Sequence, residues 1–157
     1  MTQSGSGARV LADFALPSAP ENARRVMDRV ADAVRELGLP PRQLERLKTA
    51  VSEAAMNAIE HGNHNDPELP VAVQVIATDA ELAVRITDQG GDDAIPEPET
   101  PDLDAKVAGL QTPRGWGLFL IKNMVDDMRT SSDERHHTIE LVLRLDRERG
   151  RDGNAPR

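Results

Sequence analysis

Short segments of the chain alternate hydrophobic and polar residues, which is the pattern of strands with one buried face. The first segment spans residues 10–16. Residues 71–75 and 82–86 repeat the alternation on either side of a short polar turn, which predicts a hairpin. A last segment, residues 139–145, predicts a strand that pairs with another one near residues 128–132.

Three other segments space their hydrophobic residues at the intervals of helices. Ser18 and Glu21 form an S-x-x-E capping box for the first helix, which should end at Gly38. Pro41 can open the second helix, and Gly62 stops it. The predicted apolar stripes are, in chain order, Val26, Val30, Val34 and Leu37, then Leu44, Leu47, Val51, Ala55 and Ala58, then Leu118, Ile121, Val125 and Met128.

This succession of elements predicts an α+β fold in a single domain over residues 9–145. We expect a two-layer α/β sandwich, in which helices cover one face of a mixed, mostly antiparallel sheet and leave its other face available as an interface. Residues 1–8 and 146–157 are polar or charged and predict disordered tails. Residues 92–113 are rich in proline and acidic residues around a short predicted helix at 104–110, and they form either a disordered segment or a lid.

Composition and charge narrow the choice of partners. The 157 residues carry a net charge of −8 with a pI near 5.0, which argues against general affinity for nucleic acid or anionic membranes, because phosphate binding needs clustered lysine and arginine. The chain has no cysteine, so it forms no disulfide, and this fits a reducing compartment. No apolar run reaches the roughly 18 residues of a membrane span, and we expect a cytoplasmic protein that binds other proteins.

Asp88 is the first candidate for a functional residue. Leu82, Val84 and Ile86 share one face of their strand, and Asp88 is the next residue in the same phase. A carboxylate that turns inward there needs a donor, and the amino group of a ligand would supply one. The alternative is an ordinary turn that Asp88 begins with Gly90.

Glu53 and Asn57 are the second candidates, because their four-residue spacing puts a carboxylate and an amide on one side of the second helix, opposite its apolar stripe. A base and a metal ligand could share that side. The alternative is that this side simply faces water, as polar helix faces usually do. Small alanines nearby, Ala50, Ala54, Ala55 and Ala58, leave room for a ligand.

The segment Arg114-Gly115-Trp116-Gly117 precedes the third predicted helix. Glycines at a helix start let backbone N–H groups approach an anion such as a phosphate, although an ordinary flexible loop has the same composition. The chain contains neither a P-loop motif nor the G-x-G-x-x-G motif of dinucleotide-binding folds, and it lacks a G-x-S-x-G nucleophile motif. Its four histidines, His61, His64, His136 and His137, make a poor zinc set without cysteine.

Taken together, these motifs carry a resemblance that none carries alone. Glu53-x-x-x-Asn57-Ala58-x-x-His61-Gly62, then Asp88-Gln89-Gly90, then Gly115-x-Gly117-Leu118 resemble the Bergerat-fold ATPases of the histidine-kinase-like superfamily. Within it, the chain is most similar to the anti-sigma-factor serine/threonine kinases of the RsbW and SpoIIAB type. The resemblance covers residues 10–145, nearly the whole chain.

The resemblance implies a role for each matching position. Glu53 would be the general base that takes a proton from a protein serine, and Asn57 would be a ligand of Mg²⁺. Asp88 would bind the adenine of ATP, which must lie mainly among aliphatic side chains because only 2% of the residues are aromatic. Gly90, Gly115, Gly117 and Leu118 would shape the nucleotide pocket, and residues 92–113 would be the ATP lid.

The resemblance also implies partners: a sigma factor, a STAS-domain anti-anti-sigma protein that is phosphorylated, and a second copy of the chain in a homodimer. One departure supports an alternative. Asp92 stands where the family often has a second glycine, which suggests a regulatory binding module that uses ATP without catalysis, or not at all. A histidine-kinase catalytic domain would need a phosphoacceptor helix beside it.

Overall fold

The computed structural model describes residues 7–90 and 113–145. Several predictions fall outside the described residues. They are the lid at 92–113, except for Pro113, the helix at 104–110, and the two tails, except for Gly7 and Ala8. The elements follow the predicted order, namely β1 (Arg9–Pro17), α1 (Asn22–Ala33), η1 (Arg35–Leu37), α2 (Pro41–Met56), η2 (Asn57–Gly62), β2 (Pro70–Ala77), β3 (Glu81–Asp88), α4 (Pro113–Met124), β4 (Asp127–Ser132) and β5 (His137–Arg144).

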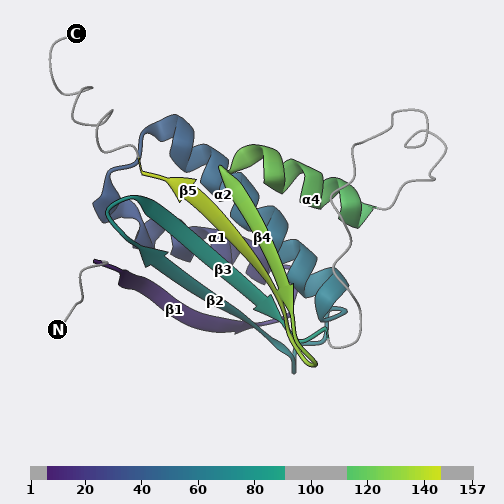
Figure 1. Cartoon of the computed structure of the whole chain (residues 1–157). Helices are drawn as coiled ribbons and strands as arrows, with labels where there is room; N and C mark the ends of the chain where they lie inside the picture. Colours follow the sequence, from purple (N-terminus) through teal and green to yellow (C-terminus); the bar gives the residue numbers. More distant parts are fainter. Residues whose placement is uncertain (1–6, 91–112, 146–157) are drawn as a thin grey trace, which may run out of the picture.

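The five strands form one sheet in the order β1-β2-β3-β5-β4 (Figure 1). Both predicted hairpins, β2–β3 and β4–β5, are confirmed, and in the first Val75 lies opposite Val84. Every pairing in the described part of the chain is antiparallel. The prediction of a mostly antiparallel sheet is therefore confirmed, but the predicted mixture with parallel pairs is not found among the described strands. Because β3 pairs with β5 rather than with β4, the last residue of β3, Asp88, lies beside the first residue of β5, His137.

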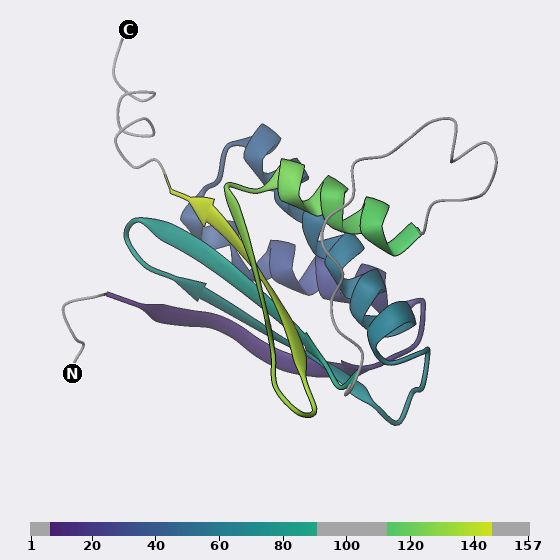
Figure 2. The ribbon, with the colours of Figure 1, turned by 45° about the vertical axis from the view of Figure 1, so that its right-hand side comes forward.

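The three α-helices cover one face of the sheet (Figures 1 and 2), which confirms the two-layer α+β fold. Helix α2 lies between α1 and α4 and contacts both. The alternating valines, leucines and isoleucines of the strands point toward this layer and pack against the predicted stripes of the first two helices. Val26, Leu47 and Val51, for example, have no exposed surface. This core fixes the positions of the helix and strand ends that carry the candidate residues.

The predicted capping box is wrong. Glu21, and not Ser18, occupies the N-cap position of α1, and its side chain makes no capping hydrogen bond. The helix begins at Asn22. The Ser18 hydroxyl is fully buried and donates instead to the carbonyl of Leu69, at 2.6 Å. A serine side chain can satisfy several backbone partners, and here a contact distant in sequence replaces the local one. The predicted end at Gly38 is only partly right, because α1 already stops at Ala33 and the 3-10 turn η1 continues to Gly38, which adopts the left-handed conformation with φ of 63°.

The other two helices differ from prediction at their ends. The second helix does run from Pro41 to Gly62, but its last six residues, η2, widen into a π-helix. The third starts at Pro113 and stops at Met124, whereas the prediction extended it to Met128. Met128 belongs to β4, where it lies opposite Leu141 and packs against the core. A strand residue that faces the core therefore happened to continue the helical spacing.

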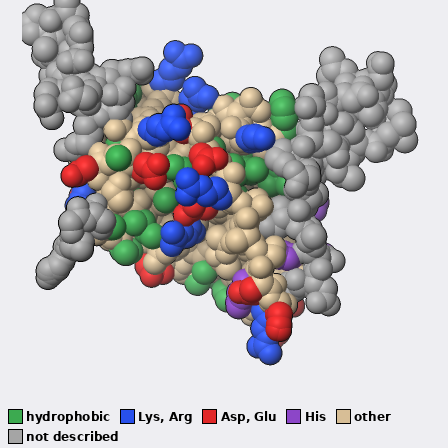
Figure 3. Space-filling view, in the orientation of Figure 1, with side chains coloured by type: hydrophobic (Ala, Val, Ile, Leu, Met, Phe, Trp, Pro, Cys, Tyr) green, Lys and Arg blue, Asp and Glu red, His purple; other side chains and the backbone are tan. Residues whose placement is uncertain are grey.

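Acidic and basic side chains mingle in the middle of the uncovered face of the sheet (Figure 3). One row crosses all five strands, in the order Asp13, Gln74, Arg85, Glu140 and Arg129. Arg85 Nε lies 2.7 Å from one carboxylate oxygen of Glu140, and Arg129 Nη1 lies 3.4 Å from the other. Opposite charges thus compensate one another across this face. Among the described helices, none has the length and apolar composition that crossing a membrane requires.

Candidate active site

Asp88 ends β3 with its side chain turned toward the helices. The residue is only 3% exposed, in phase with the buried Leu82, Val84 and Ile86, so its predicted inward direction is confirmed. Its Oδ1 also accepts a hydrogen bond from the backbone N–H of Gly90, at 2.8 Å. The two interpretations of Asp88 therefore do not exclude each other, because the turn with Gly90 fixes a carboxylate that is already buried.

Two glycines bring backbone close to this carboxylate. A Cβ atom added at Gly62, the last residue of η2, would overlap the Asp88 carboxylate. A Cβ added at Gly90 would lie 2.8 Å from Asp88 Oδ1 and 2.9 Å from His137 Nδ1. The sequence predicted Gly90 as a site residue, whereas Gly62 was predicted as a helix end and belonged to the motif of the resemblance without a role of its own. Both positions need glycine because of the close approach.

Asn63 follows Gly62 and connects this region to three other segments. It is fully buried, and its Nδ2 donates to Ser18 Oγ at 2.8 Å and lies 3.3 Å and 3.2 Å from the carbonyl oxygens of Leu69 and Pro70. Its Oδ1 accepts from the N–H of Gln89 at 2.7 Å. Asn63 thereby holds the residue after Asp88 in place. No local pattern predicts this role, because Ser18 and Gln89 are remote in the sequence.

His137 is the second residue that sequence analysis missed. It starts β5 directly opposite Asp88, is 2% exposed, and places its Nδ1 3.4 Å from Asp88 Oδ1. A signal was present in the sequence, since His137 shares the phase of Ile139 and Leu141, which are buried. Its position in the sequence beside His136 points only to a poor zinc set. Within residues 7–90 and 113–145, no group of three or more potential ligands could hold a metal ion.

Glu53 and Asn57 lie together where α2 passes into η2. Asn57 is only 4% exposed, so the interpretation of this helix side as a water-facing surface is wrong for Asn57, while Glu53 is partly exposed. The side faces α4 instead: a Cβ added at Gly117 would lie 3.3 Å from Glu53 Oε1 and 3.6 Å from Asn57 Nδ2. Arg46 on the same side donates to the Asn123 carbonyl of α4, at 2.7 Å. The pair therefore lies between two helices.

The electrostatic environment of this pair suits proton transfer. Partial burial raises the pKa of the Glu53 carboxyl above its ordinary value of 4.5, and the negative charge of Glu60 raises it further. A carboxylate with a raised pKa is a better proton acceptor near neutral pH. Within the described residues, the buried Oδ1 of Asn57 has no hydrogen-bond partner. A buried amide oxygen of this kind is a suitable ligand for a hard cation.

The two remaining glycines lie inside α4 rather than before it. The helix begins at Pro113, earlier than predicted, so Gly115 and Gly117 belong to its first turns and the alternative of a flexible loop is wrong for this stretch. Proline is well tolerated at a helix start because the first N–H groups have no partner there. Leu118 is fully buried against the core. Gly117 nevertheless faces Glu53 and Asn57, as its Cβ distances show.

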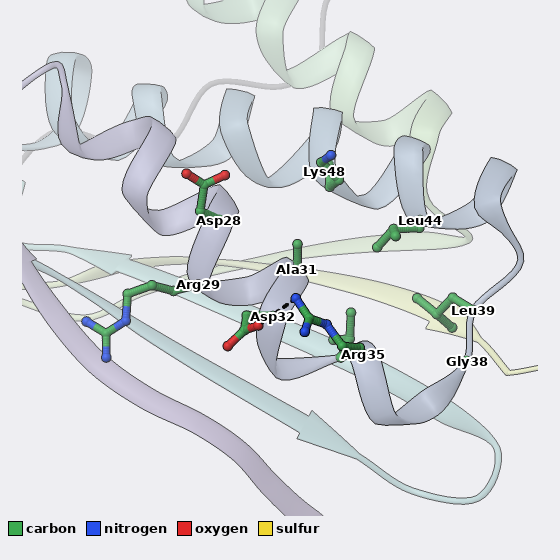
Figure 4. Close-up of a pocket in the computed structure, with 10 residues that line it drawn as sticks. Asp28, Arg29, Ala31, Asp32, Arg35, Gly38, Leu39, Leu44 and Lys48 are labelled. Carbon is green, nitrogen blue, oxygen red and sulfur yellow. Dashed lines mark ion pairs between the residues drawn. The ribbon is translucent and has the colours of Figure 1, made fainter.

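The predicted residues thus form two groups joined by one element. Asp88 and Gly90 lie at the Gly62 end of η2, while Glu53, Gly117 and Leu118 lie near its Asn57 end. A separate surface groove of about 680 Å³ runs between α1 and α2 (Figure 4), with Asp32, Arg35, Leu44 and Lys48 among its lining residues. None of the predicted site residues lines it. The groove is therefore distinct from the candidate site.

The chain is similar in sequence and fold to several known proteins. The family model described as a histidine kinase-like ATPase domain matches residues 16–143. An anti-sigma F factor of Oceanobacillus iheyensis is 30% identical over 134 residues, which cover 84% of this chain and 90% of that protein. An anti-sigma F factor of Geobacillus stearothermophilus is 33% identical over 121 residues, which cover 76% and 80%.

A relative named serine-protein kinase RsbW, from Bacillus licheniformis, is 27% identical over 142 residues and 88% of both chains. Among solved structures, the RsbU and RsbW domains of a Mycobacterium tuberculosis protein superpose with a TM-score of 0.60 at 20% identity, covering 85% of this chain and 32% of that one. A SiaB–SiaC complex from Pseudomonas aeruginosa gives a TM-score of 0.59 at 14% identity, covering 86% and 90%. At these identities, the structural likeness shows a shared fold.

Proposed function

The chain belongs to the histidine kinase-like ATPase domain family, and we propose that it is an ATP-dependent protein serine kinase that also binds a sigma factor. The observation that carries the proposal is the placement of Glu53 beside Asn57 and opposite Gly117, at the other end of η2 from the buried Asp88. One end thus offers a base and a cation ligand, and the other offers a buried acceptor. The names of the relatives, anti-sigma F factor and serine-protein kinase, support both parts of the proposal.

In this proposal each end of the site has its own task. The Asp88 carboxylate accepts a hydrogen bond from the amino group of adenine, and the wrong base would leave a buried polar group unpaired. Asn57 would hold Mg²⁺ through its buried Oδ1, and the ion would supply positive charge that stabilises the transferred phosphoryl group. Glu53 takes the proton from the attacking serine hydroxyl. Gly90, Gly115, Gly117 and Leu118 shape the pocket, and residues 92–113 act as the lid.

We further propose that the phosphorylated partner is a STAS-domain anti-anti-sigma protein, so that phosphorylation decides which partner the kinase holds and thereby regulates transcription. The net charge of −8 suits a basic face on a sigma factor. The uncovered face of the sheet offers an extended surface for a second copy of the chain in a homodimer. Partners of these kinds place the protein in the cytoplasm.

A second candidate function is a binding module that holds its partner without phosphotransfer. The specific observation in its favour is Asp92, a bulky acidic residue where relatives of this type often have glycine. Such a module would bind its partner equally well with and without ATP, and the Asp88→Asn substitution would leave that binding unchanged.

The nucleotide part of the proposal is tested by calorimetric titration of Mg-ATP, Mg-ADP and Mg-GTP into the purified protein. We expect both adenine nucleotides to bind and the guanine nucleotide not to bind. Asp88→Asn replaces one acceptor oxygen by a donor and should abolish this preference. Absence of any nucleotide binding to the native protein would refute the kinase proposal.

The chemical part is tested by incubating the protein with Mg-ATP and a STAS-domain partner and detecting phosphoserine on that partner. We expect transfer by the native protein and almost none by Glu53→Ala. If the native protein and the Glu53→Ala variant both leave the partner unmodified while nucleotide still binds, the binding-module function is supported instead.

A further inference from the structure

The side chain of Asn63 connects the end of η2 to two distant parts of the chain. The residue is fully buried, and its backbone N–H donates to the carbonyl of Ala58 in η2, at 2.8 Å. Its Nδ2 donates to the Ser18 hydroxyl, and its Oδ1 accepts from the N–H of Gln89 at 2.7 Å. A buried amide is costly unless it is hydrogen-bonded. Because both polar atoms of this side chain have partners, the network can hold its members in one arrangement.

Gln89 lies where β3 leaves the sheet. The pairing of β3 with β2 ends at Thr87, and its pairing with β5 ends at Asp88. The N–H of Gln89 therefore lies beyond the last residue pair on both sides, and it donates to Asn63 instead. The position of this peptide is thus set by a side chain that comes from the helical layer.

The hydrogen bond at Gln89 also constrains Asp88. The peptide between the two residues is planar, so the N–H of Gln89 and the Cα of Asp88 belong to one rigid unit. Fixing this N–H limits the directions in which the Asp88 side chain can leave the backbone. Gly62, which precedes Asn63, adds a steric constraint, because a Cβ there would overlap the Asp88 carboxylate. Two consecutive residues thus restrict Asp88, one through its backbone and the other through its side chain.

These contacts give Asn63 a role in the proposed recognition of adenine. A carboxylate that is oriented before the base arrives binds more tightly than one that must be ordered on binding. We propose that Asn63 is a positioning residue for base recognition, whose Oδ1 holds the Asp88 carboxylate, through the N–H of Gln89, in the direction that accepts the amino group of adenine. This inference rests on the ATP binding proposed above and extends it to a residue that acts through its neighbours.

Ser18 provides a control that separates positioning from stability. Its hydroxyl accepts from Asn63 and donates to the Leu69 carbonyl, so it belongs to the same buried network without bonding to Gln89. Without this hydroxyl, Asn63 Nδ2 keeps the carbonyl oxygens of Leu69 and Pro70, at 3.3 Å and 3.2 Å. Ser18→Ala should therefore weaken the fold while leaving the hydrogen bond to Gln89 in place.

The test measures how much the amino group of adenine contributes to binding. Calorimetric titration compares Mg-ATP with the magnesium complex of purine riboside triphosphate, which has a hydrogen atom in place of that amino group. The proteins are the native chain, Asn63→Leu and Ser18→Ala. Leucine keeps the branched shape of asparagine but can neither accept nor donate a hydrogen bond. A general loss of stability leaves the ratio of the two affinities unchanged, because both ligands meet the same fraction of folded protein.

We expect the native protein to bind ATP roughly ten- to hundred-fold more tightly than the analogue, as one hydrogen bond to a charged acceptor would cause. Asn63→Leu should lower this ratio roughly ten-fold, mainly through weaker binding of ATP. Ser18→Ala should keep the native ratio, although its midpoint of thermal unfolding falls. An unchanged ratio in Asn63→Leu, or an equal loss in both variants, would overturn the inference, because Asn63 would then only stabilise the fold.

A second measurement uses the native protein alone, so it does not depend on whether Asn63→Leu folds. Hydrogen exchange followed by NMR should show that the Gln89 amide is protected without nucleotide and changes little when Mg-ATP is added. Free exchange of this amide in the nucleotide-free protein would overturn the inference while leaving ATP binding intact. A native protein that binds neither ligand, or both equally, would instead overturn the proposed role of Asp88, and this inference with it.

Discussion

At the Gly62 end of η2, the carboxylate of Asp88 is buried and closely surrounded, whereas at the Asn57 end the carboxylate of Glu53 remains partly exposed. The first accepts a backbone N–H and has two glycines in close approach. The second has a raised pKa because of partial burial and a nearby acidic residue. The same helical element thus separates a rigid carboxylate from one whose charge is poorly stabilised.

This difference assigns different properties to the two ends. A carboxylate fixed by its surroundings can recognise one arrangement of donors, because it cannot adjust to another without losing contacts. A carboxylate with a raised pKa can exchange a proton, because its charged and neutral forms are closer in free energy. Recognition and proton transfer should therefore be separable by substitution.

Glu53→Gln should separate the rate of phosphotransfer from the affinity for Mg-ATP most strongly. The amide keeps the shape of the side chain but cannot accept the serine proton, so the rate of phosphotransfer should fall by about 10²- to 10⁴-fold. The affinity for Mg-ATP, measured by calorimetry, should change little. Glu60→Gln, an exposed neighbouring change, is the control and should keep the rate at a pH above the range in which Glu53 titrates. A parallel loss of affinity and rate in Glu53→Gln would show that the two ends are not separate.

The sequence anticipated the parts of this comparison that depend on local periodicity. The phase of β3 predicted the inward direction of Asp88, and helical spacing put Glu53 and Asn57 on one side. Whether that side faced water depended on α4, which is remote in the sequence. Its packing against the pair could not be read from the residues of the second helix.

The residues that the sequence did not predict were missed for one physical reason, namely that their partners are remote in the chain. Asn63 and Ser18 hydrogen-bond to each other across 45 positions of the chain, and His137 meets Asp88 only because β3 pairs with β5. Periodicity can indicate that such a residue is buried, as the phase of β5 does for His137, but it does not identify the remote partner. The false capping box at Ser18 arose in the same way, because a remote carbonyl competes successfully for the hydroxyl.

A smaller but still large effect is expected from Gly62→Ala, which tests the rigidity of the recognition end. The added Cβ would overlap the Asp88 carboxylate and displace it. We expect the free energy of unfolding to fall by about 1–3 kcal/mol and the ATP affinity to fall roughly ten- to hundred-fold. Thermal unfolding and calorimetric titration measure the two quantities.

Gly38→Ala is the matched control for that substitution. Gly38 has a φ of 63°, and nothing lies within 4 Å of an added Cβ, so only backbone strain is introduced. It should cost about 1–2 kcal/mol of stability and leave ATP affinity unchanged. If both variants lost affinity to the same extent, general destabilisation would account for the result and the close approach at Asp88 would not.

The smallest expected effect concerns the charge at the chemical end. Because the pKa of Glu53 is raised above 4.5 by burial and then by Glu60, the rate of phosphotransfer should rise with pH as Glu53 loses its proton. Glu60→Gln removes the second cause, so the acid limb of the rate profile should move to lower pH. Nucleotide affinity at neutral pH should stay constant. A profile that Glu60→Gln leaves in place would argue that Glu53 does not titrate in the reaction.

The raised pKa of Glu53 also makes the free energy of unfolding depend on pH. Between 4.5 and the raised pKa, folded protein retains a proton on Glu53 that unfolded protein has lost, so the free energy of unfolding decreases as pH rises through this interval. Glu53→Gln carries no titrating group at this position, and its stability should decline less over that interval than that of the native protein. Thermal unfolding across pH measures the difference. An equal decline in both proteins would mean that folding does not raise the pKa of Glu53.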